Sequence, residues 1–295
     1  MFKDIEIKSH IDTIQTSEPE FNREDNINTK GVKWYIGQNK IRTIYSLNNF
    51  DKDYKINESF SETIIKLDQI MNKLRIKDIS QCNYRRVDVA SDIMYEFNDM
   101  KKMLYFLYKC ISMATNLDGQ FKEFSNMVTK RFESYIFKSN YINIEFYDKK
   151  AQSKGAAPYP TRLEVRLLRR KTKDLKKDVM NVMKLWKKSL EMLEKAENEI
   201  LKELKDVYKA ELDSGEIHNF HSFVDNYRDY FVTRYITQEM YRYSGHSGNF
   251  KRWLELHRRN YNLKFINKTD VKLLINKIIK STIYVAKIIK SKMLF

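Results

Sequence analysis

The sequence has few of the residues that interrupt regular structure. Seven glycines and three prolines occur in 295 residues, so long helices and strands are expected rather than linkers or disordered segments. The chain has two cysteines, Cys82 and Cys110, with no Cys-x-x-Cys pair and no metal-ligand spacing. This argues against a disulfide framework and a cysteine-ligated metal site, and we expect two reduced, packed thiols.

Long uncharged apolar runs are also missing. No window reaches the ~18 apolar residues of a membrane span, and the N-terminus lacks the apolar core of a signal peptide. We therefore expect a cytoplasmic protein that does not span a membrane. Acidic residues are outnumbered, since 55 Lys and Arg stand against 39 Asp and Glu, giving a formal charge of +16. A polyanion is the expected partner, either nucleic acid or an anionic membrane surface.

Hydrophobic residues make up 42% of the chain, which is enough to fill the cores of about two domains. Strand patterns alternate with helical patterns up to residue 171, and only helical patterns follow from 172 to 295. The predicted fold class is therefore α+β: an N-terminal antiparallel or mixed sheet with helices on one face, followed by an all-helical C-terminal region. Expected strands are 2–11, a hairpin at 32–47 turning at 37–39, 84–92, 131–138, 141–148 and 161–170. Expected helices are 59–76, 98–114, one long or two stacked helices over 174–212, and further helices at 219–243, 250–261 and 270–294.

Three of these strands carry a carboxylate on one polar face. Asp88 lies on 84–92, Glu145 lies on 141–148 two residues before Tyr147, and Glu164 lies on the last strand. Because side chains of a strand alternate between its faces, a shared sheet would bring the three acids together near the Tyr147 hydroxyl, with Asp92 as a fourth candidate. Oxygen-only ligands suit Mg²⁺ or Mn²⁺. The alternative is an ordinary half-exposed sheet with one polar face.

Positive charge is concentrated after the last strand. Residues 162–188 hold eleven Lys or Arg against three acids, hence a net charge of +8. If this basic segment adjoins the polar face of the sheet, it would neutralise the phosphates of a bound nucleic acid. The alternative is an ordinary charged surface exposed to solvent, which is the more common role of such a segment. The candidate DNA-binding residues of this segment are Arg166, Arg169, Arg170, Lys171, Lys173, Lys176 and Lys177.

Three motifs, taken in order, resemble the replication initiators of rolling-circle plasmids and related plasmid and phage replication proteins. They are Arg86-x-Asp-x-Ala-x-Asp92, Phe146-Tyr-Asp-Lys149 with Gln152, and Arg162-Leu-Glu-Val-Arg166. The resemblance covers roughly residues 83–170. It implies a DNA-bound protein that nicks one strand at a plasmid's double-strand origin through a tyrosine, leaving a 5′-phosphotyrosyl link and a 3′-hydroxyl primer, with a divalent metal assisting.

The resemblance also implies roles for particular residues. Tyr147 becomes the candidate nucleophile, while Tyr135 and Tyr141 remain rivals. A phenol has a pKa near 10, so a neighbouring cation, Lys149 or Arg162, would favour its attack. The implied metal is Mg²⁺ or Mn²⁺, with ligands Asp88, Glu145 and Glu164. The sequence has no His-hydrophobic-His pair, which excludes the histidine-ligated site of another large class of nicking enzymes.

The change from strand patterns to helical patterns divides the chain into an expected catalytic domain, 1–171, and an expected helical DNA-binding or accessory domain, 172–295. Origin specificity is predicted to lie in 219–261, where arginines alternate with aromatic residues suited to base edges and unstacked bases. The candidate contacts there are Arg252, Arg258 and Arg259, and the alternative is an ordinary aromatic core with a solvated basic face. The expected partner is single- and double-stranded plasmid origin DNA. A host helicase and a second copy of the chain, forming a homodimer, are candidate partners beside it.

Three other functions fit parts of the pattern. A non-catalytic origin-binding replication or regulatory protein needs the basic segments and not the tyrosine. A metal-dependent nuclease without a covalent intermediate needs the acids alone. A membrane-surface protein would use the Lys-rich segment 270–295, which is more simply explained as an amphipathic helix packed on the C-terminal helices.

Overall fold

The computed structural model describes residues 4–18, 32–36, 41–46, 69, 83–115, 120–125, 133–261 and 266–292. The chain divides into two compact units. The sheet unit comprises Ile5–Tyr95, Asp118–Trp186 and Lys277–Phe295, and the helical unit comprises Met1–Asp4, Glu96–Leu117 and Lys187–Asn276. Both units are discontinuous in sequence. The predicted division of roles between 1–171 and 172–295 stays a prediction.

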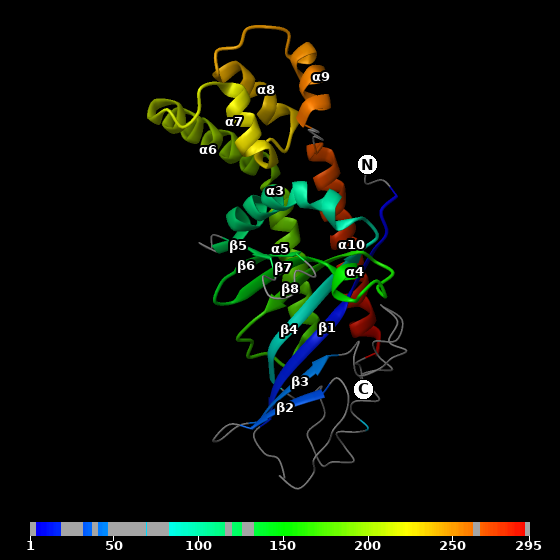
Figure 1. The fold of residues 1–295 in the computed structure, drawn as a ribbon. Helices are drawn as coiled ribbons and strands as arrows, with labels where there is room; N and C mark the ends of the chain where they lie inside the picture. Colours follow the sequence, from blue (N-terminus) through cyan, green and yellow to red (C-terminus); the bar gives the residue numbers. More distant parts are fainter. Residues whose placement is uncertain are drawn as a thin grey trace. The chain divides into compact units, whose positions relative to one another are not determined.

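The sheet unit is organised around one sheet of eight described strands (Figure 1). Their order is β2-β3-β1-β4-β8-β7-β6-β5, and every neighbouring pair is antiparallel. This confirms the predicted α+β class with an antiparallel sheet. The strands are β1 (Ile7–Glu18), β2 (Val32–Ile36), β3 (Ile41–Ser46), β4 (Asn83–Ile93), β5 (Gln120–Ser125), β6 (Glu133–Lys138), β7 (Ile142–Asp148) and β8 (Thr161–Leu167).

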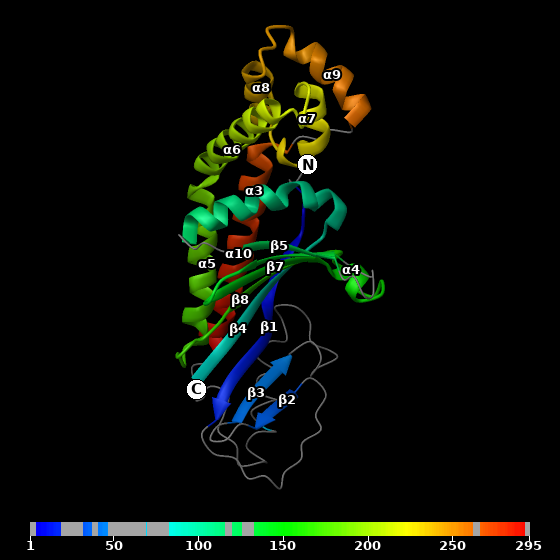
Figure 2. The same ribbon diagram turned by 60° about the vertical axis from the view of Figure 1, so that its left-hand side comes forward.

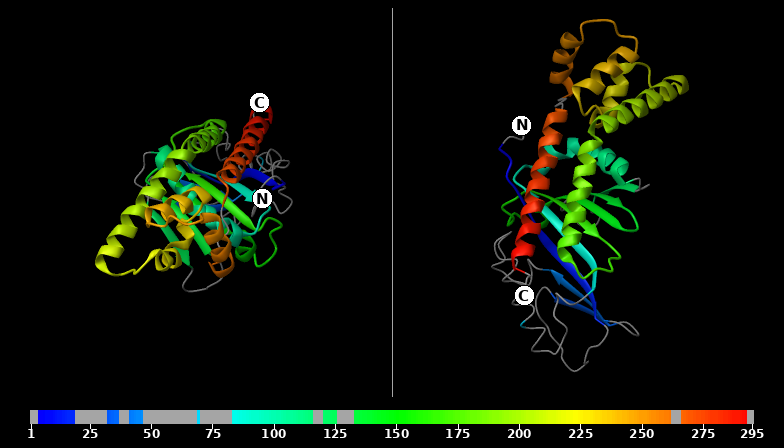
Figure 3. Two further views of the ribbon diagram at one scale, coloured as in Figure 1. Left: turned by 90° about the horizontal axis from the view of Figure 1, so that it is seen from above. Right: turned by 180° about the vertical axis from the view of Figure 1, so that it is seen from behind.

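One face of the sheet is apolar and is covered by parts of two helices, α5 (Leu175–Glu191) and α10 (Lys268–Lys292). Seen from behind, these helices run side by side across the strands (Figure 3), and the view in Figure 2 agrees. Val87, Val89 and Val165 are almost fully buried on this face, and the Ser9 backbone N–H donates to Ser281 Oγ of α10 at 2.7 Å. Asp88 and Glu164 alternate with these valines and therefore lie on the opposite face.

The helical unit contains α3 (Phe97–Thr115), α6 (Leu193–Ser214), α7 (Phe220–Tyr227), the 3-10 turn η2 (Arg228–Tyr230), α8 (Arg234–Tyr243), α9 (Phe250–Tyr261) and the first part of α10. The predicted helical stretch 174–212 is two helices that meet at Met192. Gly215 ends α6 at φ 77°, a left-handed conformation that favours glycine. Phe220 and Phe223 are fully buried and contact Tyr208 edge-on.

Several predicted elements differ from those observed. The first strand runs over Ile7–Glu18 rather than 2–11, and β5 was not predicted. The four-residue helix α4 (Lys149–Gln152) follows β7 directly. The predicted turn 37–39, nearly all of the predicted helix 59–76 and Cys82 lie outside the described residues. Cys110 is fully buried, as expected for a packed thiol, and burial raises its pKa to about 12.

None of the described helices combines the length and the apolar character that crossing a membrane requires.

Candidate functional site

The polar face of the sheet spans four adjacent strands, β1, β4, β8 and β7. Glu145 on β7 is directly opposite Glu164 on β8, and Asp88 on β4 is directly opposite Arg166 on β8. Residues directly opposite each other in an antiparallel pair share a face. Asp88, Glu145 and Glu164 therefore lie together on one face of neighbouring strands, as the alternating pattern predicted.

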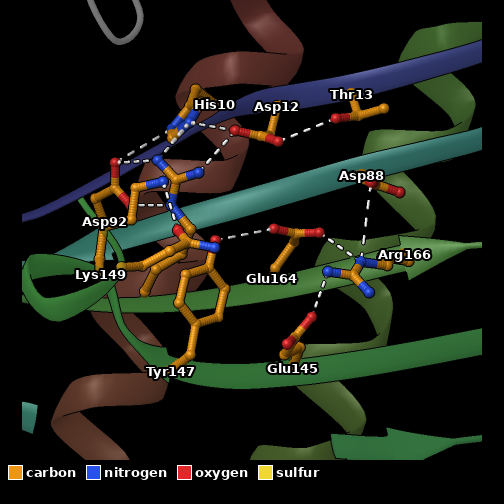
Figure 4. Close-up of polar contacts among 12 residues, drawn as sticks. His10, Asp12, Thr13, Asp88, Asp92, Glu145, Tyr147, Lys149, Glu164 and Arg166 are labelled. Carbon is orange, nitrogen blue, oxygen red and sulfur yellow. Dashed lines mark hydrogen bonds and ion pairs between the residues drawn. The ribbon is translucent and has the colours of Figure 1, made fainter. Parts of the chain in front are cut away.

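These three carboxylates gather around Arg166, and the four residues are called the Arg166 cluster here (Figure 4). Arg166 Nε donates to Glu164 Oε1 at 2.5 Å and lies 3.9 Å from Asp88 Oδ2. A terminal guanidinium nitrogen donates to Glu145 Oε2. Asp88 also accepts from Arg86 Nε at 2.7 Å. Arg166, predicted as a DNA contact, is thus engaged inside the protein, because closely spaced acids with little exposure need a counter-charge.

Burial changes the protonation of this cluster. It raises the pKa of Asp88 to about 7, even though the hydrogen bonds from Arg86 act in the opposite direction. Burial also raises the pKa of Glu145 above its usual value, against the charge of Arg166. Asp88 and Glu145 therefore hold protons more readily than exposed acids do, and the neighbouring arginines favour their charged forms.

The Arg166 cluster does not fit a metal ion in this arrangement. A divalent cation requires carboxylate oxygens directed at one point, and both Glu145 and Glu164 are directed at the guanidinium of Arg166. Within the described residues, no group of three or more His, Cys, Asp or Glu could hold a metal. A metal bound by Asp88, Glu145 and Glu164 would require Arg166 to withdraw from them.

A second group of polar residues surrounds Arg162, and it is called the Arg162 cluster. Arg162 is 3% exposed and donates to Asp92 Oδ2 at 2.9 Å and to Asp12 Oδ1 at 2.7 Å. Its Nη2 also lies 3.4 Å from Nε2 of the buried His10. Asp92, considered as a fourth metal ligand, belongs to this cluster.

Sequence reasoning missed His10 and Asp12. The pairing of β1 with β4 shifts between Ile11 and Thr13, so Asp12 lies at a β-bulge and its side chain reaches the polar face beside His10 (Figure 4). Burial alone would raise the pKa of Asp12, but hydrogen bonding to His10 and the charge of Arg162 hold it below its usual range. The alternation of polar and apolar residues in His10-Ile11-Asp12 indicates that His10 and Asp12 share a face. Asp12 lies beyond the predicted strand, which ends at Ile11.

Tyr147 lies between the two clusters. Its hydroxyl donates to Glu164 Oε2 at 3.3 Å, and the Lys149 ammonium lies 5.8 Å from its ring centroid. Burial raises the pKa of the Tyr147 phenol, and the charge of Arg162 opposes this only in part. Burial lowers the pKa of Lys149, and the charge of Arg162 lowers it further. The protonated Tyr147 phenol thus faces a carboxylate that accepts its hydrogen bond, and the ammonium beside it, that of Lys149, has a lowered pKa.

The two rival tyrosines are placed differently. Tyr135 on β6 is directly opposite Phe146, and Phe146 is directly opposite Leu163, so Tyr135 belongs to the apolar face. Tyr141 lies in the turn between β6 and β7 and is 60% exposed. Of the three candidates, only Tyr147 lies on the polar face with the carboxylates.

The predicted DNA-binding residues after β8 form the basic arm, which is Arg169, Arg170, Lys171, Lys173, Lys176 and Lys177. Four of them are exposed, namely Arg169, Lys171, Lys173 and Lys177. Arg170 Nε donates to the buried Asp178 at 2.7 Å and so anchors the start of α5. In the helical unit Arg252 is exposed, while the side chains of Arg258 and Arg259 lie outside those described.

Replacing Arg162 by methionine should destabilise the fold strongly. The change leaves Asp92 and Asp12 without their main counter-charge, and breaking a buried ion pair from one side costs about 3–5 kcal/mol. Urea unfolding measures this loss. The exposed Lys173→Met is the control and should change the unfolding free energy by no more than about 0.5 kcal/mol. If both variants behave alike, Arg162 does not organise the cluster.

Comparison with known proteins assigns this chain to no family. The chain matches no protein-family model and no curated protein. It is similar to a solved structure described as "Structure of Rolling Circle Replication Initiator Protein from Geobacillus stearothermophilus", with a TM-score of 0.31 and 14% identity, over 61% of this chain and 78% of that chain.

Proposed function

We propose that this protein is a replication initiator of the rolling-circle type, which binds plasmid origin DNA and nicks one strand through Tyr147. The observation that carries the proposal is the hydrogen bond from the Tyr147 hydroxyl to the Glu164 carboxylate. This hydrogen bond places a candidate nucleophile next to a proton acceptor on the polar face of the sheet, close to Arg162 and Lys149. The same residues form the motifs that resemble these initiators.

The proposed reaction is a single phosphoryl transfer. The Tyr147 oxygen attacks the scissile phosphorus while its proton passes to Glu164, so the new O–P bond forms on a nucleophile activated by an adjacent base. The bond from phosphorus to the 3′-oxygen breaks, and that oxygen takes a proton to become the 3′-hydroxyl primer. Lys149 suits this donor role because burial lowers its pKa. The positive charges of Lys149 and Arg162 favour the charge that develops on phosphate oxygens.

Tyr147 is 4% exposed, so DNA has to displace side chains that cover it. Lys149 lies over the ring, and a phosphate that attracts its ammonium would draw it away. Binding of the DNA strand and exposure of the Tyr147 hydroxyl would therefore occur together.

The basic arm is proposed to supply affinity through phosphates. Reversing the charge of its exposed residues (Arg169→Glu, Lys171→Glu, Lys173→Glu, Lys177→Glu) should weaken binding to origin and unrelated DNA alike, and should flatten the salt dependence of the binding constant. Arg170 stays unchanged because it anchors Asp178. Fluorescence anisotropy at several salt concentrations measures both effects.

Three reversals at exposed lysines of α6 (Lys195→Glu, Lys202→Glu, Lys209→Glu) are the control and should change binding less for each reversed charge. Loss of origin binding alone, with unrelated DNA still bound, would show that the arm recognises bases and would contradict its proposed role.

A non-catalytic origin-binding protein is the second candidate. The burial of Tyr147 and the closure of the carboxylates around Arg166 favour it. Incubation with a supercoiled plasmid that carries the gene's own flanking DNA, in Mn²⁺ and in EDTA, separates the candidates. A covalent protein–DNA adduct indicates the tyrosine mechanism, free nicks indicate a nuclease without a covalent intermediate, and unbroken DNA indicates a binding protein.

The metal requirement and the protein partners remain predictions. Mg²⁺ or Mn²⁺ would be held by Asp88, Glu145 and Glu164 after Arg166 withdraws, and when bound it would supply a Lewis acid for the scissile phosphate. Origin specificity in 219–261 is likewise proposed, from the arginines and aromatic residues that alternate there, and a host helicase and a second copy of the chain are candidate partners.

A further inference from the structure

The helical unit contains a cavity that the proposed nicking reaction does not use. Its volume is about 650 Å³, which is within the usual range for small-molecule sites. The lining combines α6, α8, α9 and the start of α10, all within the helical unit. Eight polar residues of the lining determine what the cavity can bind: Glu194, Glu197, Asn198, Thr233, Arg234, Tyr235, Asn267 and Lys268.

The buried acid of the lining is already neutralised. Glu197 is 4% exposed and accepts hydrogen bonds from Thr233 Oγ1 at 2.8 Å and from Lys268 Nζ at 2.7 Å. Its two carboxylate oxygens are therefore both engaged. Glu197 is thus poorly placed to attract a cationic ligand.

Arg234 brings an uncompensated positive charge to the cavity. Its side chain is exposed, and no ion pair joins it to another residue in the described part of the chain. It is the first residue of α8, whose first turn contains no acid. A cation is unfavourable there because the start of a helix carries partial positive charge. Lys268, the first residue of α10, differs in this respect, because it is paired with Glu197 and the first turn of α10 contains Asp270. An anion in the cavity would relieve the charge of Arg234.

Tyr235 and Asn198 add a second kind of recognition. Tyr235 follows Arg234 directly and is 46% exposed, so the cavity has an aromatic surface beside its positive charge. Asn198 is exposed on α6 and offers an amide donor and acceptor. A phosphate that carries a flat heterocyclic base matches this combination, because bases stack on aromatic side chains and phosphates pair with arginine.

We propose that this cavity binds a nucleotide, with its phosphate on Arg234 and its base against Tyr235. The nucleotide is either one unit of single-stranded DNA or a free mononucleotide, since both present the same groups. The proposal is independent of the nicking step, because none of the lining residues belongs to the sheet unit.

Two variants and two matched controls test the site. Arg234→Gln and Tyr235→Leu remove the proposed contacts, while Arg242→Gln and Tyr284→Leu change residues that are also exposed and lie outside the cavity lining. Binding is measured by fluorescence titration with a short single-stranded oligonucleotide that carries a fluorescent base, with deoxynucleoside monophosphates, and with inorganic phosphate as competitor. All titrations use full-length protein carrying Tyr147→Phe, so that the presence or absence of nicking does not affect the result.

Tyr235→Leu should weaken binding of the oligonucleotide about tenfold, since one base–aromatic stack is worth roughly 1–3 kcal/mol. Arg234→Gln should have a similar effect, and the controls should have little. Binding of monophosphates to the protein, lost in Arg234→Gln, would identify a free nucleotide as ligand, whereas binding of the oligonucleotide alone would identify a DNA unit. The proposal is overturned if neither variant differs from its control, or if only inorganic phosphate binds.

Discussion

Tyr147→Phe is expected to abolish strand nicking and covalent adduct formation while DNA binding changes by no more than about twofold. The substitution removes the oxygen that donates to Glu164 and retains the ring, which is almost fully buried. Loss of one hydrogen bond costs about 1 kcal/mol of stability, too little to unfold the site. Nicking of supercoiled plasmid, gel detection of the adduct and anisotropy measure the three quantities.

Tyr141→Phe is the matched control for this prediction. Tyr141 is exposed in the turn before β7, and its substitution should leave nicking unchanged. Full activity of Tyr147→Phe together with loss of activity in Tyr141→Phe would reverse the assignment. Activity of both variants would exclude each of these tyrosines as the nucleophile.

Arg166→Gln is expected to convert the Arg166 cluster into a divalent-cation site. Without the guanidinium, the three acids keep their positions on neighbouring strands. Glu145 and Glu164 lose the charge that holds their oxygens, while Asp88 keeps its hydrogen bonds from Arg86. The free energy of unfolding should fall by about 3–5 kcal/mol without metal, and Mn²⁺ should restore part of it by binding only the folded state. Titration of Mn²⁺ by electron paramagnetic resonance should show affinity at least about tenfold above that of the native protein.

Arg170→Gln is the control, because it also breaks an arginine–carboxylate pair, with Asp178, but leaves the Arg166 cluster intact. It should gain no affinity for Mn²⁺. Adding Glu164→Gln to Arg166→Gln should remove the gained affinity. Tight binding of Mn²⁺ by native protein, unchanged in Arg166→Gln, would mean that the arginine does not compete for the carboxylates.

Local pattern predicted the elements that carry the site. Alternation over 84–92, 141–148 and 161–170 predicted three strands with their polar faces, and these are β4, β7 and β8. Alternation fixes which residues share a face because it depends only on the geometry of one strand. The convergence of Asp88, Glu145 and Glu164 needed the further assumption that the strands are neighbours, which the sheet order fulfils.

Pairing over long range could not be predicted in the same way. Asp12 reaches Arg162 because β1 pairs with β4 through a bulge, and neither the partner strand nor the bulge is encoded in the local pattern. The role of Arg166 was missed for a related reason. Sequence gives the charge of a side chain but not its partner, so an arginine in a basic run was predicted to contact DNA although it lies among carboxylates. The short strand β5 lacks a strong alternation of polar and apolar residues.

The central claim is that Tyr147 forms a covalent bond with DNA. Mass spectrometry of the trapped protein–DNA adduct, after digestion of both components, locates the modified residue. A nucleotide phosphate on the peptide that contains Tyr147, absent from the Tyr147→Phe protein, is the predicted result. A phosphate on Tyr135, on Tyr141 or on a tyrosine of the helical unit would contradict it.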